Sequence, residues 1–120
     1  TMKEEVRAND DAIHDPGGRA LSIRWDVSDP QAAKDLVSQV EQQWGHIDAL
    51  INGAGPYHRV NLFDETVEGW NEMFACNLHP IFYLAKAVAP GMKARKSGRI
   101  ISFSMANADQ MISKPDVTAH

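Results

Sequence analysis

The stretch Ile47-Asp48-Ala49-Leu50-Ile51-Asn52-Gly53-Ala54-Gly55 decides the fold class of this chain. Its apolar run predicts a short strand over 47–51 that passes directly into an asparagine and two glycines. In an open parallel sheet, ligands bind beyond the carboxyl ends of the strands. Glycines at that point let a nucleotide approach the backbone and permit positive φ, and the asparagine can bond the backbone of a neighbouring strand. Taken alone, residues 52–55 also fit an ordinary turn at a strand end.

The segments on either side alternate between helix and strand. Asp29 and Pro30 predict a helix start, and Gly45 predicts its end. Between them, apolar residues recur at the spacing of one helix face: Ala33, Leu36, Val37, Val40 and Trp44. The sequence further predicts a helix over 2–15, a strand over 20–25, a helix over 67–95, a strand over 99–104 and a loop over 105–120. Pro80 lacks the N–H that would bond the Cys76 carbonyl, so we expect a kink there. This alternation is typical of an α/β architecture with a parallel sheet.

Size and composition exclude several classes of protein. A chain of 120 residues and 13.3 kDa allows one modest domain. It contains no apolar run near the ~18 residues of a membrane span, and its first residues are too polar for a signal peptide. With a net charge of −4 and scattered Lys and Arg, we expect no nucleic-acid surface. A single cysteine, Cys76, cannot form an internal disulfide. We therefore expect a cytoplasmic protein that does not bind membranes.

Polar residues follow the predicted strands and interrupt the long helix. Asp26-Val27 comes after the 20–25 strand, where a carboxylate can accept a hydrogen bond from an exocyclic amine such as that of adenine. It can also be a helix-entry aspartate, although Asp29 already serves as the cap. Asn77 lies within the helix near Pro80, where a distorted backbone offers a free carbonyl and room for a water, or it bonds only locally.

The 99–104 strand ends in hydroxyl side chains, including Ser104, which also fit simple polarity at a strand end. Cys76 and His79 have the spacing of two helical metal ligands, but no second pair completes a site, so we expect no metal.

Together, in this order and spacing, these residues resemble the short-chain dehydrogenase/reductase family. The resemblance runs over about residues 2–104. It rests on Asp26-Val27, Asn52-Gly53-Ala54-Gly55, Asn77, Gly98-Arg99-Ile100-Ile101 and the helix text from Gly69-Trp70-Asn71 to Pro90-Gly91-Met92. Within the family, the sequence is most similar to the 3-oxoacyl-(acyl-carrier-protein) reductases.

The resemblance implies a Rossmann-type, doubly wound parallel sheet, of which residues 1–120 form a single partial NAD(P)-binding domain. It implies hydride transfer between NAD or NADP, with NADP favoured, and a small carbonyl or acyl-carrier-bound substrate. It also assigns roles to particular positions. The residues implied to line the cofactor are Asp26, Val27, Asn52, Gly53, Ala54 and Gly55. Asn77 is implied to hold a water of the proton relay, and a serine just past the last strand is implied to orient the substrate carbonyl.

The sequence departs from the family pattern in three places. The Gly-rich phosphate loop is absent, and no Tyr-x-x-x-Lys follows either Tyr57 or Tyr83. Strict register from Gly98 places Met105 at the substrate-orienting position, one residue after Ser104. Either the loop is shifted and Ser104 serves, or the protein does without that serine; Asp109 is a further hydrogen-bonding group in the same loop.

The family's strand order, 3-2-1-4-5, places two further strands between the predicted strands at 20–25 and 47–51. We therefore expect these residues to be part of a longer reductase, inactive by themselves, that forms a dimer or tetramer through the 67–95 helix. A catalytically inactive relative that binds nucleotide or acts as a scaffold is the main alternative. A signalling module of flavodoxin-like topology would need paired acidic residues after its first strand, which this sequence lacks.

Overall fold

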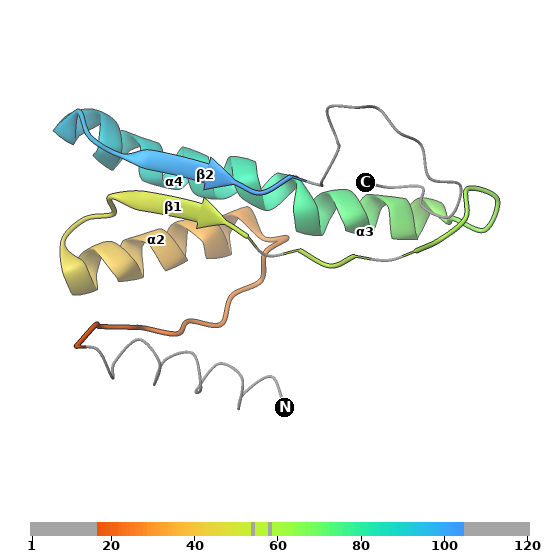
Figure 1. Cartoon of the computed structure of the whole chain (residues 1–120), viewed down its shortest axis with the longest axis horizontal. Helices are drawn as coiled ribbons and strands as arrows, with labels where there is room; N and C mark the ends of the chain where they lie inside the picture. Colours follow the sequence, from red (N-terminus) through yellow and green to blue (C-terminus); the bar gives the residue numbers. More distant parts are fainter. Residues whose placement is uncertain (1–16, 54, 58, 105–120) are drawn as a thin grey trace.

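The computed structural model describes residues 17–53, 55–57 and 59–104 (Figure 1). Its elements are, in chain order, α2 (Pro30–Trp44), β1 (Ala49–Asn52), α3 (Val67–Asn77), α4 (His79–Arg95) and β2 (Arg99–Ser102). The predicted alternation of helices with parallel strands is confirmed. The expected 2–15 helix and 105–120 loop lie outside the described residues.

Local signals define both ends of α2 as the sequence predicts. The Asp29 carboxylate accepts a hydrogen bond from the Gln31 N–H at 2.8 Å, and Pro30 occupies the first helical position. At the other end, Gly45 adopts a φ of 90°, and its N–H donates to the Glu41 carbonyl at 2.7 Å. The positive φ explains why glycine ends this helix.

β1 and β2 are parallel neighbours with a simple register. Ala49 pairs with Arg99, and Asn52 pairs with Ser102. Two backbone bonds lie just outside the strands: the Arg99 N–H donates to the Asp48 carbonyl at 2.9 Å, and the Phe103 N–H donates to the Asn52 carbonyl at 3.1 Å. Both strands are shorter than predicted: β2 lies within 99–104, whereas β1 begins two residues after the start of the predicted 47–51 strand and extends one residue beyond its end, to Asn52.

The predicted strand over 20–25 is wrong. Among the described residues this segment forms no strand, although its side chains alternate in exposure, with Ile23 and Trp25 half-buried. Trp25 packs against the main core. A strand requires a hydrogen-bonded neighbour, and the family order places two other strands between this segment and β1. Residues 20–25 therefore have the alternating pattern of a strand but no hydrogen-bonded neighbouring strand among the described residues.

The long helix breaks at Leu78. We expected one kinked helix over 67–95; instead α3 and α4 are separate, with Leu78 between them at φ −104° and ψ −48°. The Leu78 N–H still bonds the Phe74 carbonyl at 3.0 Å, but Pro80 has no N–H for the carbonyl of Cys76. Pro80 instead occupies the first turn of α4, where no such bond is required.

The hydrophobic core lies between α2 and α4. Its buried side chains are Ala33, Val37, Leu84, Val88 and Met92. Leu50 of β1 packs against this cluster, so the helix pair covers one face of the sheet. Ile51 points to the other face and is 60% exposed. In the described part of the chain, each helix is too short or too polar to cross a membrane.

Candidate functional site

The candidate site lies at the carboxyl edge of the two strands. β1 and β2 point in the same direction, and α3 extends beyond their ends (Figure 1). α2 runs back against the strands, so its first turn, preceded by Asp26, starts from this same edge. The two-stranded sheet therefore gathers most of the predicted polar residues at one end.

Asn52 joins the two strands through its side chain. Its Nδ2 donates to the Ser102 Oγ at 3.1 Å. We expected a bond to the neighbouring backbone; the register places Ser102 directly opposite Asn52, so a hydroxyl meets the amide first. Oδ1 of Asn52 is buried and finds no hydrogen-bond partner among the described residues. Ser102 was missed from sequence as a site residue, because only the register shows what it faces.

The two glycines after β1 have different surroundings. A Cβ built on Gly53 would lie 3.6 Å from the Phe103 ring, which is ordinary contact. A Cβ on Gly55 would overlap the Asn77 amide oxygen and lie 3.0 Å from its Cγ. The sequence allowed a positive φ at Gly53, but Gly53 does not adopt one. Its lack of a side chain therefore leaves open surface beside Phe103. Ala54 lies outside the described residues.

Asn77 is the last residue of α3, not a mid-helix residue as we expected. The break at Leu78 follows it at once, because Pro80 ends the α3 hydrogen-bond ladder. The Asn77 Nδ2 donates to the Met73 carbonyl at 2.9 Å, and the Met73 sulfur lies 3.8 Å away. The structure thus brings two predicted residues, Gly55 and Asn77, into contact at the strand edge.

Asp26 forms a local turn ahead of α2. One carboxylate oxygen accepts bonds from the Ser28 hydroxyl at 2.7 Å and the Ser28 N–H at 2.9 Å. These bonds, the hydroxyl first, hold the pKa of the exposed Asp26 carboxyl below its ordinary value. As predicted, Asp29 caps the helix, while Asp26 forms the turn that leads into it. Val27 is half-buried beside it, and no hydrogen bond between described residues connects Asp26 to residues 52–53 or 55.

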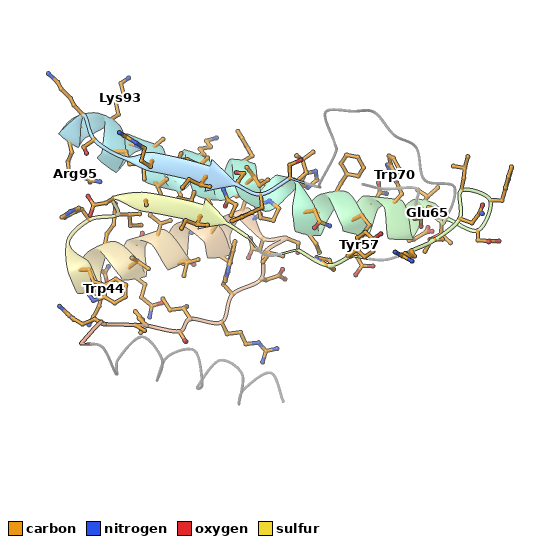
Figure 2. The ribbon with its side chains drawn as sticks, in the orientation of Figure 1. Trp44, Tyr57, Glu65, Trp70, Lys93 and Arg95 are labelled. Atoms are coloured by element: carbon orange, nitrogen blue, oxygen red, sulfur yellow. The ribbon has the colours of Figure 1, made fainter. Side chains whose placement is uncertain are left out.

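Ser104 is exposed just after β2. Its rivals at the substrate-orienting position, Met105 and Asp109, lie outside the described residues. Tyr57 is exposed and lies near Trp70 and Glu65 at the α3 end of the molecule (Figure 2). Within the described ranges, no three His, Cys, Asp or Glu side chains could hold a metal ion together.

The basic residues at the end of α4 lie far from this edge. Figure 2 shows Lys93 and Arg95 at the opposite end of the molecule from Tyr57 and Trp70. Arg95 donates from Nη2 to the Ile47 carbonyl at 2.6 Å, and both cations lie in the last turn of α4, where they complement the helix dipole. Arg95 therefore supports the segment that leads into β1 rather than the candidate site.

Comparisons with known proteins agree with this geometry. A metagenomic short-chain oxidoreductase crystallised with NADP superposes with a TM-score of 0.84 at 31% identity, covering 95% of this chain and 51% of that one. A short chain dehydrogenase of Burkholderia cenocepacia, also in complex with NADP, gives a TM-score of 0.80 at 26% identity, with 93% and 45% covered. The predicted Rossmann-type α/β fold is therefore confirmed.

Sequence relatives point the same way. A short chain dehydrogenase of Pseudocercospora fijiensis is 40% identical over 87% of this chain and 32% of its own length. An acetoacetyl-CoA reductase of Rhizobium meliloti is 34% identical over 72% of this chain and 36% of its own length. The chain spans about a third of the length of these curated relatives. The family described as short chain dehydrogenase matches residues 1–114, and the chain belongs to that family.

Proposed function

We propose that these 120 residues form the central part of an NAD(P)-dependent oxidoreductase. The reaction is hydride transfer between the nicotinamide cofactor and a carbonyl or alcohol substrate. The observation that carries this proposal is the contact of Gly55 with Asn77 beside the Asn52–Ser102 pair, at the carboxyl edge of parallel strands. The two neighbouring structures that hold NADP support the same cofactor, with NADP favoured over NAD.

The residues at this edge are suited to hold such a cofactor. Gly53 leaves its surface open, and the buried Oδ1 of Asn52 is an acceptor that still needs a donor. Asp26 has a carboxylate oxygen beyond the one that Ser28 occupies, which suits an amine of adenine, with Val27 beside it. The cofactor itself supplies or accepts the hydride. Ala54 completes the proposed cofactor segment.

Asn77 is proposed to hold a water of the proton relay. When a carbonyl is reduced, its carbon takes the hydride and its oxygen takes a proton, which must come from a relay of hydrogen-bonded groups. Asn77 ends α3 beside the helix break, where the interrupted ladder leaves room for a water. Ser104 is proposed to orient the substrate carbonyl from the end of β2.

The substrate class is proposed as a small carbonyl compound or an acyl-carrier-bound 3-oxoacyl thioester. The similarity to the Rhizobium meliloti acetoacetyl-CoA reductase supports a 3-oxoacyl thioester. A 2,5-dichloro-2,5-cyclohexadiene-1,4-diol dehydrogenase of Sphingobium indicum, 36% identical over 77% of this chain and 37% of its own length, supports a wider range of alcohols. A panel of both kinds of substrate is therefore the appropriate assay.

The complete reductase is further proposed to form a dimer or tetramer through α3 and α4. Leu78, between the two helices, is 53% exposed and Phe82 of α4 is 61% exposed, whereas Leu84 and Val88 of α4 are buried in the core. Exposed apolar side chains at this density favour association with another subunit. Light scattering of the purified protein measures its oligomeric state, and a monomer would contradict this part of the proposal.

The first experiment is an intact mass of the purified protein, followed by NADPH oxidation with a panel of ketones and 3-oxoacyl thioesters. We expect a mass near twice the 13.3 kDa of these residues, and carbonyl-dependent NADPH oxidation. A protein of that larger mass that binds NADPH but turns over none of the panel would instead be a catalytically inactive, nucleotide-binding relative.

A further inference from the structure

The position that a side chain on Gly55 would take is already occupied by Asn77. A Cβ added there would overlap the Asn77 Oδ1, lie 3.0 Å from the Asn77 Cγ and lie 3.8 Å from its Cα. Both the side chain and the backbone at the end of α3 therefore lie against this glycine. Any residue other than glycine must displace the Asn77 amide.

A shift of the Asn77 amide has a cost. Its Nδ2 is bonded to the Met73 carbonyl at 2.9 Å, one turn earlier in α3. Met73 is the residue that α3 buries, so this bond joins the amide to the part of α3 that packs inward. Rotation of the amide breaks this bond, and the helix break at Leu78 leaves no further turn of α3 to take up the strain.

Gly53 provides the contrast within the same motif. A Cβ there would touch only the Phe103 ring, at 3.6 and 3.7 Å, which are ordinary contact distances. The two glycines therefore differ in how a side chain would be accommodated. Gly53 leaves open surface beside Phe103. At Gly55, the absence of a side chain leaves the space that the Asn77 amide occupies.

We infer that Gly55 is a positioning residue, which acts by seating the Asn77 side chain rather than by contacting the cofactor. This inference rests on the proposed role of Asn77 in the proton relay. Gly55 fixes where the amide stands relative to β1, because it is the point at which the strand-end segment touches the end of α3. Its replacement therefore affects proton transfer and leaves cofactor binding intact.

The test is a double-mutant cycle in the full-length protein, with Gly55→Ala, Asn77→Ala, the combination, and Asn71→Ala, at an exposed position of α3, as the control. Steady-state kinetics give kcat and the KM for NADPH, and urea unfolding gives the midpoint of each variant. We expect Gly55→Ala to lower kcat about tenfold or more, with the KM for NADPH within about twofold. Asn71→Ala stays close to wild type. In the Asn77→Ala background, Gly55→Ala lowers kcat less than about twofold further.

Three results would overturn the inference: effects of Gly55→Ala and Asn77→Ala that multiply in the double variant, a raised KM for NADPH with kcat retained, or equal effects of Gly55→Ala and Asn71→Ala. The urea midpoints test the seating without any turnover. Gly55→Ala lowers the midpoint when Asn77 is present and leaves it unchanged when residue 77 is alanine. If wild type reduces no carbonyl, the proposed function fails while these midpoints still decide the contact. If Gly55→Ala fails to fold, recovery of folding in the double variant supports the contact, and continued failure refutes it.

Discussion

Replacing Asn77 with alanine in the full-length protein will lower its activity much more than its stability. The Asn77 Nδ2 donates to the Met73 carbonyl at 2.9 Å and lies 3.8 Å from the Met73 sulfur, in a partly buried setting. Loss of such a bond lowers the free energy of unfolding by about 1 kcal/mol. A typical domain is stable by at least about 5 kcal/mol, so the variant stays folded at room temperature.

The expected loss of activity is much larger than this stability change. A group that takes part in proton transfer contributes about 100-fold or more to the rate. Removing it raises the activation barrier by about 2.7 kcal/mol for a 100-fold fall in kcat. A kcat loss of that size in a protein with a nearly unchanged urea midpoint cannot come from unfolding, so it reports on the relay itself.

The assay is steady-state NADPH oxidation with a saturating carbonyl substrate, run beside urea unfolding of the same preparation. Asn71→Ala is the matched control, because Asn71 is an exposed asparagine on the same helix and makes no recorded bond. We expect the control to keep wild-type kcat. If Asn77→Ala turns over within a few-fold of wild type, the relay role assigned to Asn77 is wrong.

Four other changes test other parts of the structure. Asp26→Ala will raise the KM for NADPH about tenfold with little change in kcat, and the opposite pattern in steady-state kinetics would remove the adenine assignment. Because bonds from Ser28 hold the pKa of Asp26 down, the stabilisation they give is present above the ordinary carboxyl pKa and is lost as pH falls through the lowered one. An NMR titration of Ser28→Ala will show that pKa rise. Val88→Ala, at a side chain only 2% exposed, will destabilise the protein by about 2–3 kcal/mol in urea. The same change at Val67, 71% exposed, will alter stability by less than about 0.5 kcal/mol. Gly45→Ala will lower stability by about 1–2 kcal/mol from backbone strain at φ 90°, and a thermal melt equal to wild type would contradict this.

Sequence predicted best where a single short segment contains all the determinants. The cap at Asp29, Pro30 and the positive φ of Gly45 are neighbours along the chain, and the helix between them was predicted to the residue. The strand over 20–25 failed for the converse reason. Ile23 and Trp25 are half-buried between exposed neighbours, which is the alternation of a strand. A strand also needs a hydrogen-bonded neighbouring strand, and no local sequence pattern can supply one.

The candidate site shows the same difference between residues that local sequence identifies and contacts that depend on distant partners. Asn52, Gly55 and Asn77 were identified from their spacing, and the structure places the last two in contact. The pairing of Asn52 with Ser102 joins residues fifty positions apart, so it could be known only once the register of β1 and β2 was known. Pro80 signalled a disturbance of the helix, but its form, a complete break, depended on Pro80 being buried in the first turn of α4.

The break at Leu78 also separates two helices, α3 and α4, that differ in how many side chains they bury. α4 buries Pro80, Leu84, Val88 and Met92, whereas α3 buries Met73 alone. Local opening of a protein begins where few apolar contacts hold a segment, so α3 opens at lower free energy than α4. Asn77 thus lies at the boundary between a loosely held and a firmly held unit. Transient opening of α3 would carry its amide away from Gly55 while the core between α2 and α4 stays closed.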